Sequence, residues 1–127
     1  MTLEQGFLWV VAVGFAAIGV GFLSAPVAWA RYIEILVPTP TARTDLRATY
    51  GGFVLAFGVF LGVSALWPDW TRAGLAAAGL ALAGVAAGRL IGILVEGVAS
   101  RLMYVFLFIE ITGAVLAFYA LVHHGRL

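Results

Sequence analysis

The sequence contains no cysteine and no lysine, and it has few charged residues of either sign. Without cysteine the chain forms no disulfide, has no thiol nucleophile and offers no thiolate to a metal. The absence of cysteine does not indicate whether the protein lies in an oxidising or a reducing compartment. All seven residues counted as lysine or arginine are arginine, and the formal net charge is +1. Nucleic-acid-binding proteins usually have a dense basic surface, and a net charge this close to zero does not indicate one. We therefore expect no nucleic-acid partner.

The shortage of charge goes together with a high hydrophobic content. Charged residues make up 10% of the 127 residues and hydrophobic residues 64%, and the mean hydropathy is +1.10. A water-soluble domain of this size needs more charge to cover its surface, whereas a bilayer requires polar ends and an internally hydrogen-bonded backbone. The composition therefore predicts an integral membrane protein with one domain.

Four long apolar stretches divide the chain. Each is long enough to cross a hydrocarbon core of about 30 Å as a helix. The second and third links between them are tight, which makes consecutive helices antiparallel. The predicted fold is an all-α, four-transmembrane antiparallel helix bundle, with spans at about 6–24, 45–67, 71–96 and 101–122.

The first span has a competing interpretation as a signal peptide, because Ala28-Trp29-Ala30 resembles a small-x-small cleavage site. The residues before the span include Glu4 but no lysine or arginine, and the apolar run is longer than the core of a signal peptide. We therefore favour a membrane-spanning helix.

The segment between the first two spans is the longest polar interruption. Residues 27–36 mix apolar, aromatic and charged side chains, which predicts a short helix in the membrane interface. Pro38 and Pro40 predict an extended turn after it, and Thr44 with Asp45 is expected to cap the second span.

An even number of spans puts both termini and the link at Pro68 on one side of the membrane. The other side carries more arginine and is expected to face the cytoplasm, so both termini are expected outside. The arginines on the two sides are Arg31, Arg43, Arg47 and Arg101 against Arg72 and Arg126.

Two opposite charges lie deep within the predicted spans. Arg89 lies seven residues before the end of the third span at Glu96, which places it about 10 Å below the surface. Glu110 lies nine residues into the fourth span from Arg101, about 14 Å deep. Because adjacent antiparallel helices bring these depths together, we predict that Arg89 pairs with Glu110.

Three further residues, Arg47, Tyr50 and Glu96, extend this predicted cluster toward the surface and make a polar pocket. Two interpretations are open: the cluster binds a ligand, or the ion pair only fixes the register of the helices. A paired arginine keeps a carboxylate ionised, which argues against a simple proton carrier.

Glycines recur at spacings that allow close contact between helices. The strip at Gly84, Gly88 and Gly92 predicts packing against a helix of the bundle or of another subunit. The helix-packing glycines predicted in full are Gly51, Gly52, Gly58, Gly62, Gly84, Gly88 and Gly92.

The two adjacent histidines near the C-terminus, His123 and His124, point in different directions on a helix. They make a poor metal site, so no metal is predicted. No cofactor motif is present either.

The string TDLRATYGG at residues 44–52, with Gly88-Arg89, Glu96-Gly97 and Glu110, resembles the small bacterial four-helix membrane proteins grouped as domain of unknown function 4345. The resemblance covers nearly the whole chain, and the glutamate of Glu96-Gly97 departs from the aspartate more usual in that family. It implies the four-helix fold, the polar cluster and a bacterial inner membrane location. It implies no activity.

Three functions remain open. We favour a binding or accessory protein, in which the Arg/Glu pocket holds a lipid or an apolar small molecule, or in which the bundle stabilises a homo-oligomer or larger membrane complex. The second is a small proton-coupled transporter, although the small multidrug exporters of similar length depend on a carboxylate within the first helix, and here Glu4 precedes it. The third is an intramembrane enzyme, in which Arg47 and Tyr50 polarise a substrate, but the spans contain no histidine.

Overall fold

The computed structural model describes residues 1–126, which fold almost entirely as helix. Among these residues there is no strand, and four helical spans are long and apolar enough to cross a membrane. The second span is one continuous helix made of α3, η1 and α4. The elements are α1 (Leu3–Ser24), α2 (Pro26–Tyr32), α3 (Pro40–Leu46), η1 (Arg47–Phe53), α4 (Val54–Leu66), α5 (Pro68–Glu96) and α6 (Arg101–Val122).

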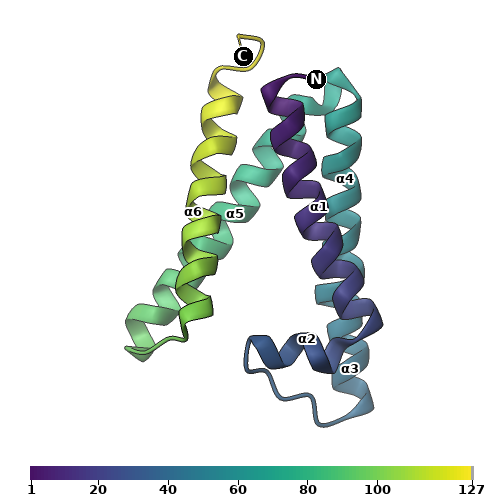
Figure 1. The fold of residues 1–127 in the computed structure, drawn as a ribbon, viewed down its shortest axis with the longest axis vertical. Helices are drawn as coiled ribbons and strands as arrows, with labels where there is room; N and C mark the ends of the chain where they lie inside the picture. The colour runs from purple at the N-terminus through teal and green to yellow at the C-terminus, as the bar shows by residue number, and fades with distance from the viewer. Residues whose placement is uncertain (127) are drawn as a thin grey trace.

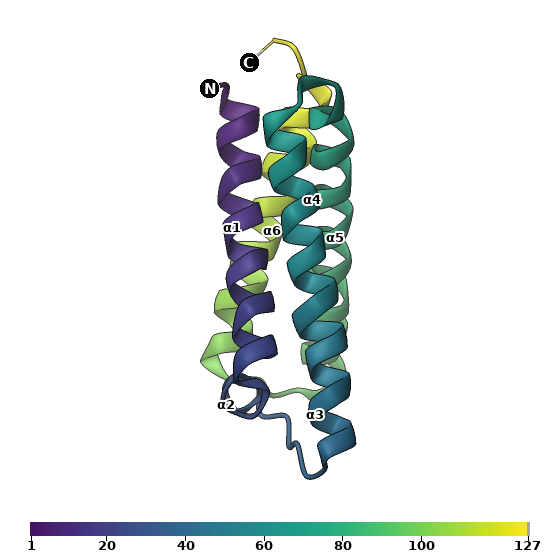
Figure 2. The same cartoon turned by 90° about the vertical axis from the view of Figure 1, so that its right-hand side faces the viewer.

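The long helices form two antiparallel pairs. Helix α1 packs along α4 and η1, and α5 packs along α6 (Figure 1). The pairs meet near the two termini and diverge toward the opposite end, where short α2 lies across the axis of the long helices (Figure 1). Both termini lie at the same end, as an even number of spans requires (Figure 2). The predicted four-helix transmembrane fold is confirmed, and the divergence of its two halves is a feature that the sequence does not indicate.

A small core joins the two pairs at the end where they meet. Its buried members come from α1, α4, α5 and α6, and many are alanines, which let the helices approach closely. Gly74 of α5 faces the side chain of Ser64 on α4, and a Cβ on Gly74 would collide with it. The buried core residues are Leu8, Ala12, Leu61, Ala65, Leu75, Ala78 and Ala120.

Large apolar side chains are exposed along every long helix. Val13 on α1, Val59 on α4, Leu94 on α5 and Phe108 on α6 are all more than half exposed. Contiguous apolar surface of this extent is characteristic of a protein that faces lipid. The helices therefore have the surface that a membrane-spanning bundle requires.

Prolines begin helices here instead of separating them. The second span starts at Pro40, not at Asp45, because Thr39 Oγ1 accepts a hydrogen bond from the Ala42 amide at 3.1 Å and caps it. A proline at the first helical position loses nothing, since that amide has no partner within the helix. The predicted cap at Thr44 and Asp45 is therefore wrong. Pro68 likewise occupies the first helical position of α5, so α5 starts there and not at Thr71.

The segment Arg47–Phe53 is a π-helix within the second span, where regular α-helix was predicted. A π-helix is wider than an α-helix, so it changes the direction in which the following side chains project, and such segments are frequent at functional sites. This one contains Arg47, Tyr50, Gly51 and Gly52, all of which were predicted as site or packing residues.

The α1–α4 pair depends on close backbone contact at Gly58. A Cβ at this position would lie 2.8 Å from the Ala16 backbone nitrogen and 2.9 Å from the Ala12 carbonyl oxygen. Gly51 is similarly close to Leu23, whereas Gly62 has ordinary contact with Trp9. The packing predicted for these three glycines is confirmed. A Cβ on Gly52 would meet only the carbonyl of Arg47, in the same span.

We predict that Gly58→Ala lowers the free energy of unfolding by about 1–3 kcal/mol, because the helices must separate to admit the methyl group. Gly84→Ala is the matched control: no atom lies within 4 Å of its Cβ position, so the change should leave stability unchanged or raise it by up to about 1 kcal/mol. Circular dichroism during denaturation in mixed detergent micelles measures both. Equal effects of the two substitutions would contradict the packing described here.

Candidate functional site

Arg89 of α5 and Glu110 of α6 form a two-pronged ion pair. Arg89 Nε donates to Glu110 Oε2 at 2.9 Å, and Arg89 Nη2 donates to Glu110 Oε1 at 2.6 Å. This fork geometry is the strongest arrangement of a guanidinium and a carboxylate. The pairing predicted from the depths of the two residues is confirmed.

The third nitrogen of Arg89 is also engaged. Arg89 Nη1 donates to Met103 Sδ at 3.1 Å, and the guanidinium carbon lies 5.3 Å from the centre of the Phe106 ring. Both neighbours belong to α6, so Arg89 ties α5 to α6 through one charged and two weakly polar contacts. The pair nevertheless keeps 20% (Arg89) and 12% (Glu110) of its side-chain surface exposed. It therefore ties α5 to α6 and is still partly exposed.

Tyr50, which was also predicted for the cluster, packs against α1. Its ring packs on Phe22 of α1, with 5.0 Å between ring centres, and 40% of the residue is exposed. Among the described residues it has no hydrogen bond to Arg89 or Glu110, so its place in the cluster stays a prediction.

Arg47 and Glu96 do not join the cluster that was predicted for them. Arg47 Nε donates to the Leu23 carbonyl oxygen at 3.0 Å, so it stabilises the C-terminal end of α1. Glu96 is exposed as the last residue of α5, and Gly97 follows it in the left-handed conformation that ends the helix. Glu96 lies seven residues beyond Arg89 on α5, Arg47 belongs to the other helix pair, and neither has a hydrogen bond or ion pair to Arg89 or Glu110 among the described residues. A direct contact among the five polar residues is therefore not formed, and a shared pocket stays a prediction.

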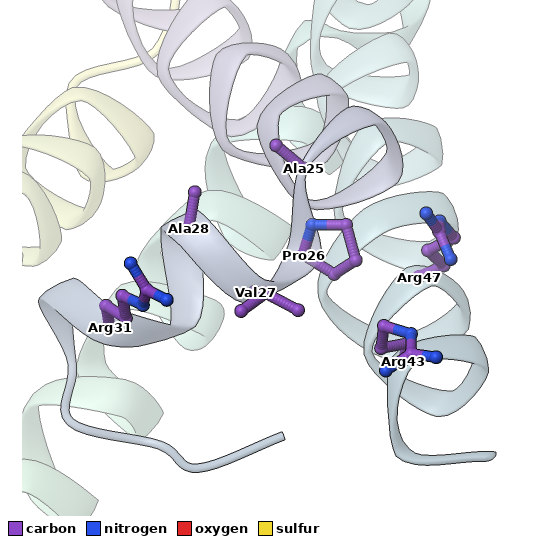
Figure 3. A pocket seen from close by; sticks show the side chains of 7 residues that line it. All are labelled: Ala25, Pro26, Val27, Ala28, Arg31, Arg43 and Arg47. Atoms are coloured by element: carbon purple, nitrogen blue, oxygen red, sulfur yellow. The ribbon is translucent and has the colours of Figure 1, made fainter. Parts of the chain in front are cut away.

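A second arginine cluster lies at the end where the helix pairs diverge. Arg31 of α2, Arg43 of α3 and Arg47 of η1 border an open hollow of about 320 Å³ (Figure 3). Sequence reasoning treated Arg31 and Arg43 only as charges that flank the spans. The sequence feature that could have indicated this cluster is the excess of arginine on this side of the membrane. The rest of the lining is apolar: Ala25, Pro26, Val27 and Ala28.

A third polar contact joins the two ends of the chain. Glu4 is 5% exposed, and its carboxylate contacts His124 Nδ1 at 2.9 Å and accepts from the Gly125 amide at 3.3 Å. It connects the start of α1 with the turn that follows α6. No sequence pattern indicates this contact, because its partners are 120 residues apart.

The strip of Gly84, Gly88 and Gly92 lies on an open face of α5. All three glycines are exposed, and no atom comes within 4 Å of a Cβ built on any of them. Packing against another helix of the same chain is therefore a wrong prediction. Contact with a second subunit stays a prediction.

No group of three or more His, Asp or Glu side chains converges on one point within residues 1–126. The described chain therefore has no place of this kind for a metal ion. Its polar groups are arginines, single carboxylates and a tyrosine, which suit binding through hydrogen bonds and ion pairs.

Four apolar spans, with an ion pair between α5 and α6 and an arginine cluster at one end, define a small multi-span integral membrane protein. The chain belongs to the family described as Domain of unknown function (DUF4345), which matches residues 3–121. That match includes η1, Arg89 and Glu110, and it ends before His124. No curated protein and no solved structure shows a significant match.

We predict that Arg89→Ala and Glu110→Ala each destabilise the protein by about 3 kcal/mol, because each leaves an unpaired charge within a span. The double variant Arg89→Met/Glu110→Leu should be close to wild type in stability, since two apolar side chains of similar volume replace the pair. Denaturation followed by circular dichroism measures all three. If the single variants matched wild type, Arg89 and Glu110 would not hold α5 against α6.

Proposed function

We propose that the protein binds an amphiphilic molecule from within the bilayer, either a membrane lipid or an apolar small molecule with a polar head. The observation that carries this proposal is the partial exposure of the Arg89–Glu110 pair within a membrane span. Few polar atoms lie at this depth of a bilayer, so a polar head group that reaches this depth is stabilised most by contact with the ion pair.

The hydrogen-bonding capacity of Glu110 supports a polar head at this pair. Each oxygen of Glu110 accepts one hydrogen bond from Arg89, and a carboxylate oxygen accepts more than one. A hydroxyl or amide head group can therefore donate to Glu110 without breaking the ion pair.

The apolar part of such a molecule has matching surface nearby. Leu90 and Leu94 on α5 and Phe53 on η1 are all more than 40% exposed. Apolar side chains at these positions are in lipid-like surroundings, where an acyl chain replaces bulk lipid at little cost. Affinity in this proposal therefore comes from the head group and its orientation.

The contacts of the same residues argue against the two other functions considered. Proton-coupled transport needs a carboxyl group that is free to exchange its proton, and both oxygens of Glu110 accept hydrogen bonds from Arg89. The contacts of Arg47 and Tyr50 do not favour catalysis, because Arg47 Nε donates to the Leu23 carbonyl and the Tyr50 ring packs on Phe22, which are structural contacts.

An accessory role in a larger assembly is the second candidate function. It is favoured by the strip of Gly84, Gly88 and Gly92, which is open in the single chain and has the spacing that lets membrane helices approach closely. A homo-oligomer and a complex with a different membrane protein both fit this role.

The binding proposal is tested by native mass spectrometry of protein released gently from membranes. Wild type should retain a lipid or small molecule, and Arg89→Met/Glu110→Leu should lose it by roughly tenfold, because its polar contacts are gone. Asp69→Asn/Arg72→Gln, at exposed positions at the other end of the bundle, is the matched control, because it also removes one negative and one positive charge. A ligand that persists in the double variant, or a wild type without one, would overturn the proposal.

We also propose that the protein lies in the inner membrane of a bacterium with both termini outside. Four arginines lie toward the end that carries α2 and the α5–α6 link, namely Arg31, Arg43, Arg47 and Arg101, against Arg72 and Arg126 at the other end. The positive-inside tendency puts the richer end in the cytoplasm.

This orientation predicts that alkaline phosphatase fused after residue 127 is active in a bacterial host, because that enzyme works only outside the cytoplasm. A fluorescent protein that folds only in the cytoplasm should stay dark at the same position. The reverse pattern would place both termini in the cytoplasm.

A further inference from the structure

We propose that Arg31, Arg43 and Arg47 form a binding site for the phosphate group of an anionic lipid at the membrane surface. The site goes beyond the function proposed above, because it shares no residue with the Arg89–Glu110 pair and belongs to other helices. Three observations lead to it: the three arginines border one hollow, none of them has a carboxylate partner among the described residues, and the hollow lies at the end of the spans.

The three arginines come from separate elements and border one hollow. Arg31 belongs to α2, whereas Arg43 and Arg47 belong to the start of the second span, and the turn between them brings both sides to one hollow. Figure 3 shows Arg43 and Arg47 on one side of the Pro26–Val27 turn and Arg31 on the other. The hollow, about 320 Å³, falls at the lower end of the range for small-ligand pockets.

No carboxylate neutralises this cluster within residues 1–126. No acidic residue lines the hollow, and the two ion pairs found in the described chain involve Arg89 and His124. Glu34 and Asp45 are close in sequence but do not border the hollow. Arg31, Arg43 and Arg47 border the hollow without a carboxylate among its lining residues, so the local charge is positive and attracts an anion.

One of the three arginines is held in place before any ligand binds. Arg47 Nε donates to the Leu23 carbonyl, which fixes the side chain, and its two terminal nitrogens make no contact of this kind in the described chain. A guanidinium fork that is already oriented binds phosphate with a smaller loss of side-chain freedom.

The position of the hollow selects a lipid head group as the source of the phosphate. The hollow adjoins the C-terminal end of α1 and the first turns of the second span, where membrane-crossing helices reach the head-group region. Trp29 and Tyr32 of α2 are exposed beside it, as is usual for aromatic residues at a membrane interface. The apolar lining, Ala25 to Ala28, suits the glycerol part of a lipid.

The test compares phosphatidylglycerol with phosphatidylcholine of the same acyl chains, each titrated into purified protein and counted by native mass spectrometry. Wild type should bind phosphatidylglycerol more tightly. Arg31→Gln/Arg43→Gln should weaken that binding roughly tenfold and leave phosphatidylcholine unchanged. Arg47 is kept because it also stabilises the end of α1.

The matched control is Arg72→Gln/Arg126→Gln, which removes the same charge from exposed positions at the opposite end. Equal weakening in both double variants would overturn the site, because net charge alone would then explain the binding. Inorganic phosphate that binds wild type and displaces phosphatidylglycerol completely would assign the hollow to free phosphate and overturn the lipid assignment.

The Arg89→Met/Glu110→Leu variant separates this site from the proposed function. It should keep its preference for phosphatidylglycerol, because it retains all three arginines of the hollow. A loss of that preference would show that the anionic lipid binds at the ion pair, and the surface site would be refuted.

Discussion

Inside a bilayer a polar group has no water to bind, so it must find its partner within the protein, and much of this structure follows from that constraint. Ser64 Oγ donates to the Phe60 carbonyl, and Thr71 Oγ1 donates to the Ser64 carbonyl across the turn between α4 and α5. Arg89 uses all three of its nitrogens. Among the described residues, no buried side-chain nitrogen or oxygen lacks a partner.

The constraint also divides the arginines into two kinds. Arg89, within a span, is paired with a carboxylate of the neighbouring helix, and the pair fixes how α5 and α6 lie together. Arg31, Arg43 and Arg47, at the end of the spans, have no such partner and share one hollow. An arginine can stay unpaired only where water or head groups reach it. The two clusters therefore meet different surroundings and suit different ligands.

Several particular features could be predicted from the sequence. Hydropathy located the four spans, because a helix must be apolar over the thickness of the bilayer. Depth along two antiparallel helices paired Arg89 with Glu110, because the rise per residue is nearly constant. The starts of two helices are predicted less well. The sequence indicates a turn at Pro40 and a link at Pro68, yet each of these prolines is the first residue of a helix. A proline pattern alone does not distinguish these two uses.

Hydropathy and the regular rise of a helix are enough to predict four membrane spans and to locate the charges within them, so both could be read from the sequence. Which helix faces meet depends on tertiary packing. Arg47 belongs to one helix pair and Arg89 to the other, and the fold of the first link places Arg31 and Arg43 on the border of one hollow. These outcomes depend on packing between segments distant in sequence, such as Ala16 against Gly58 and Glu4 against His124, which local patterns do not encode.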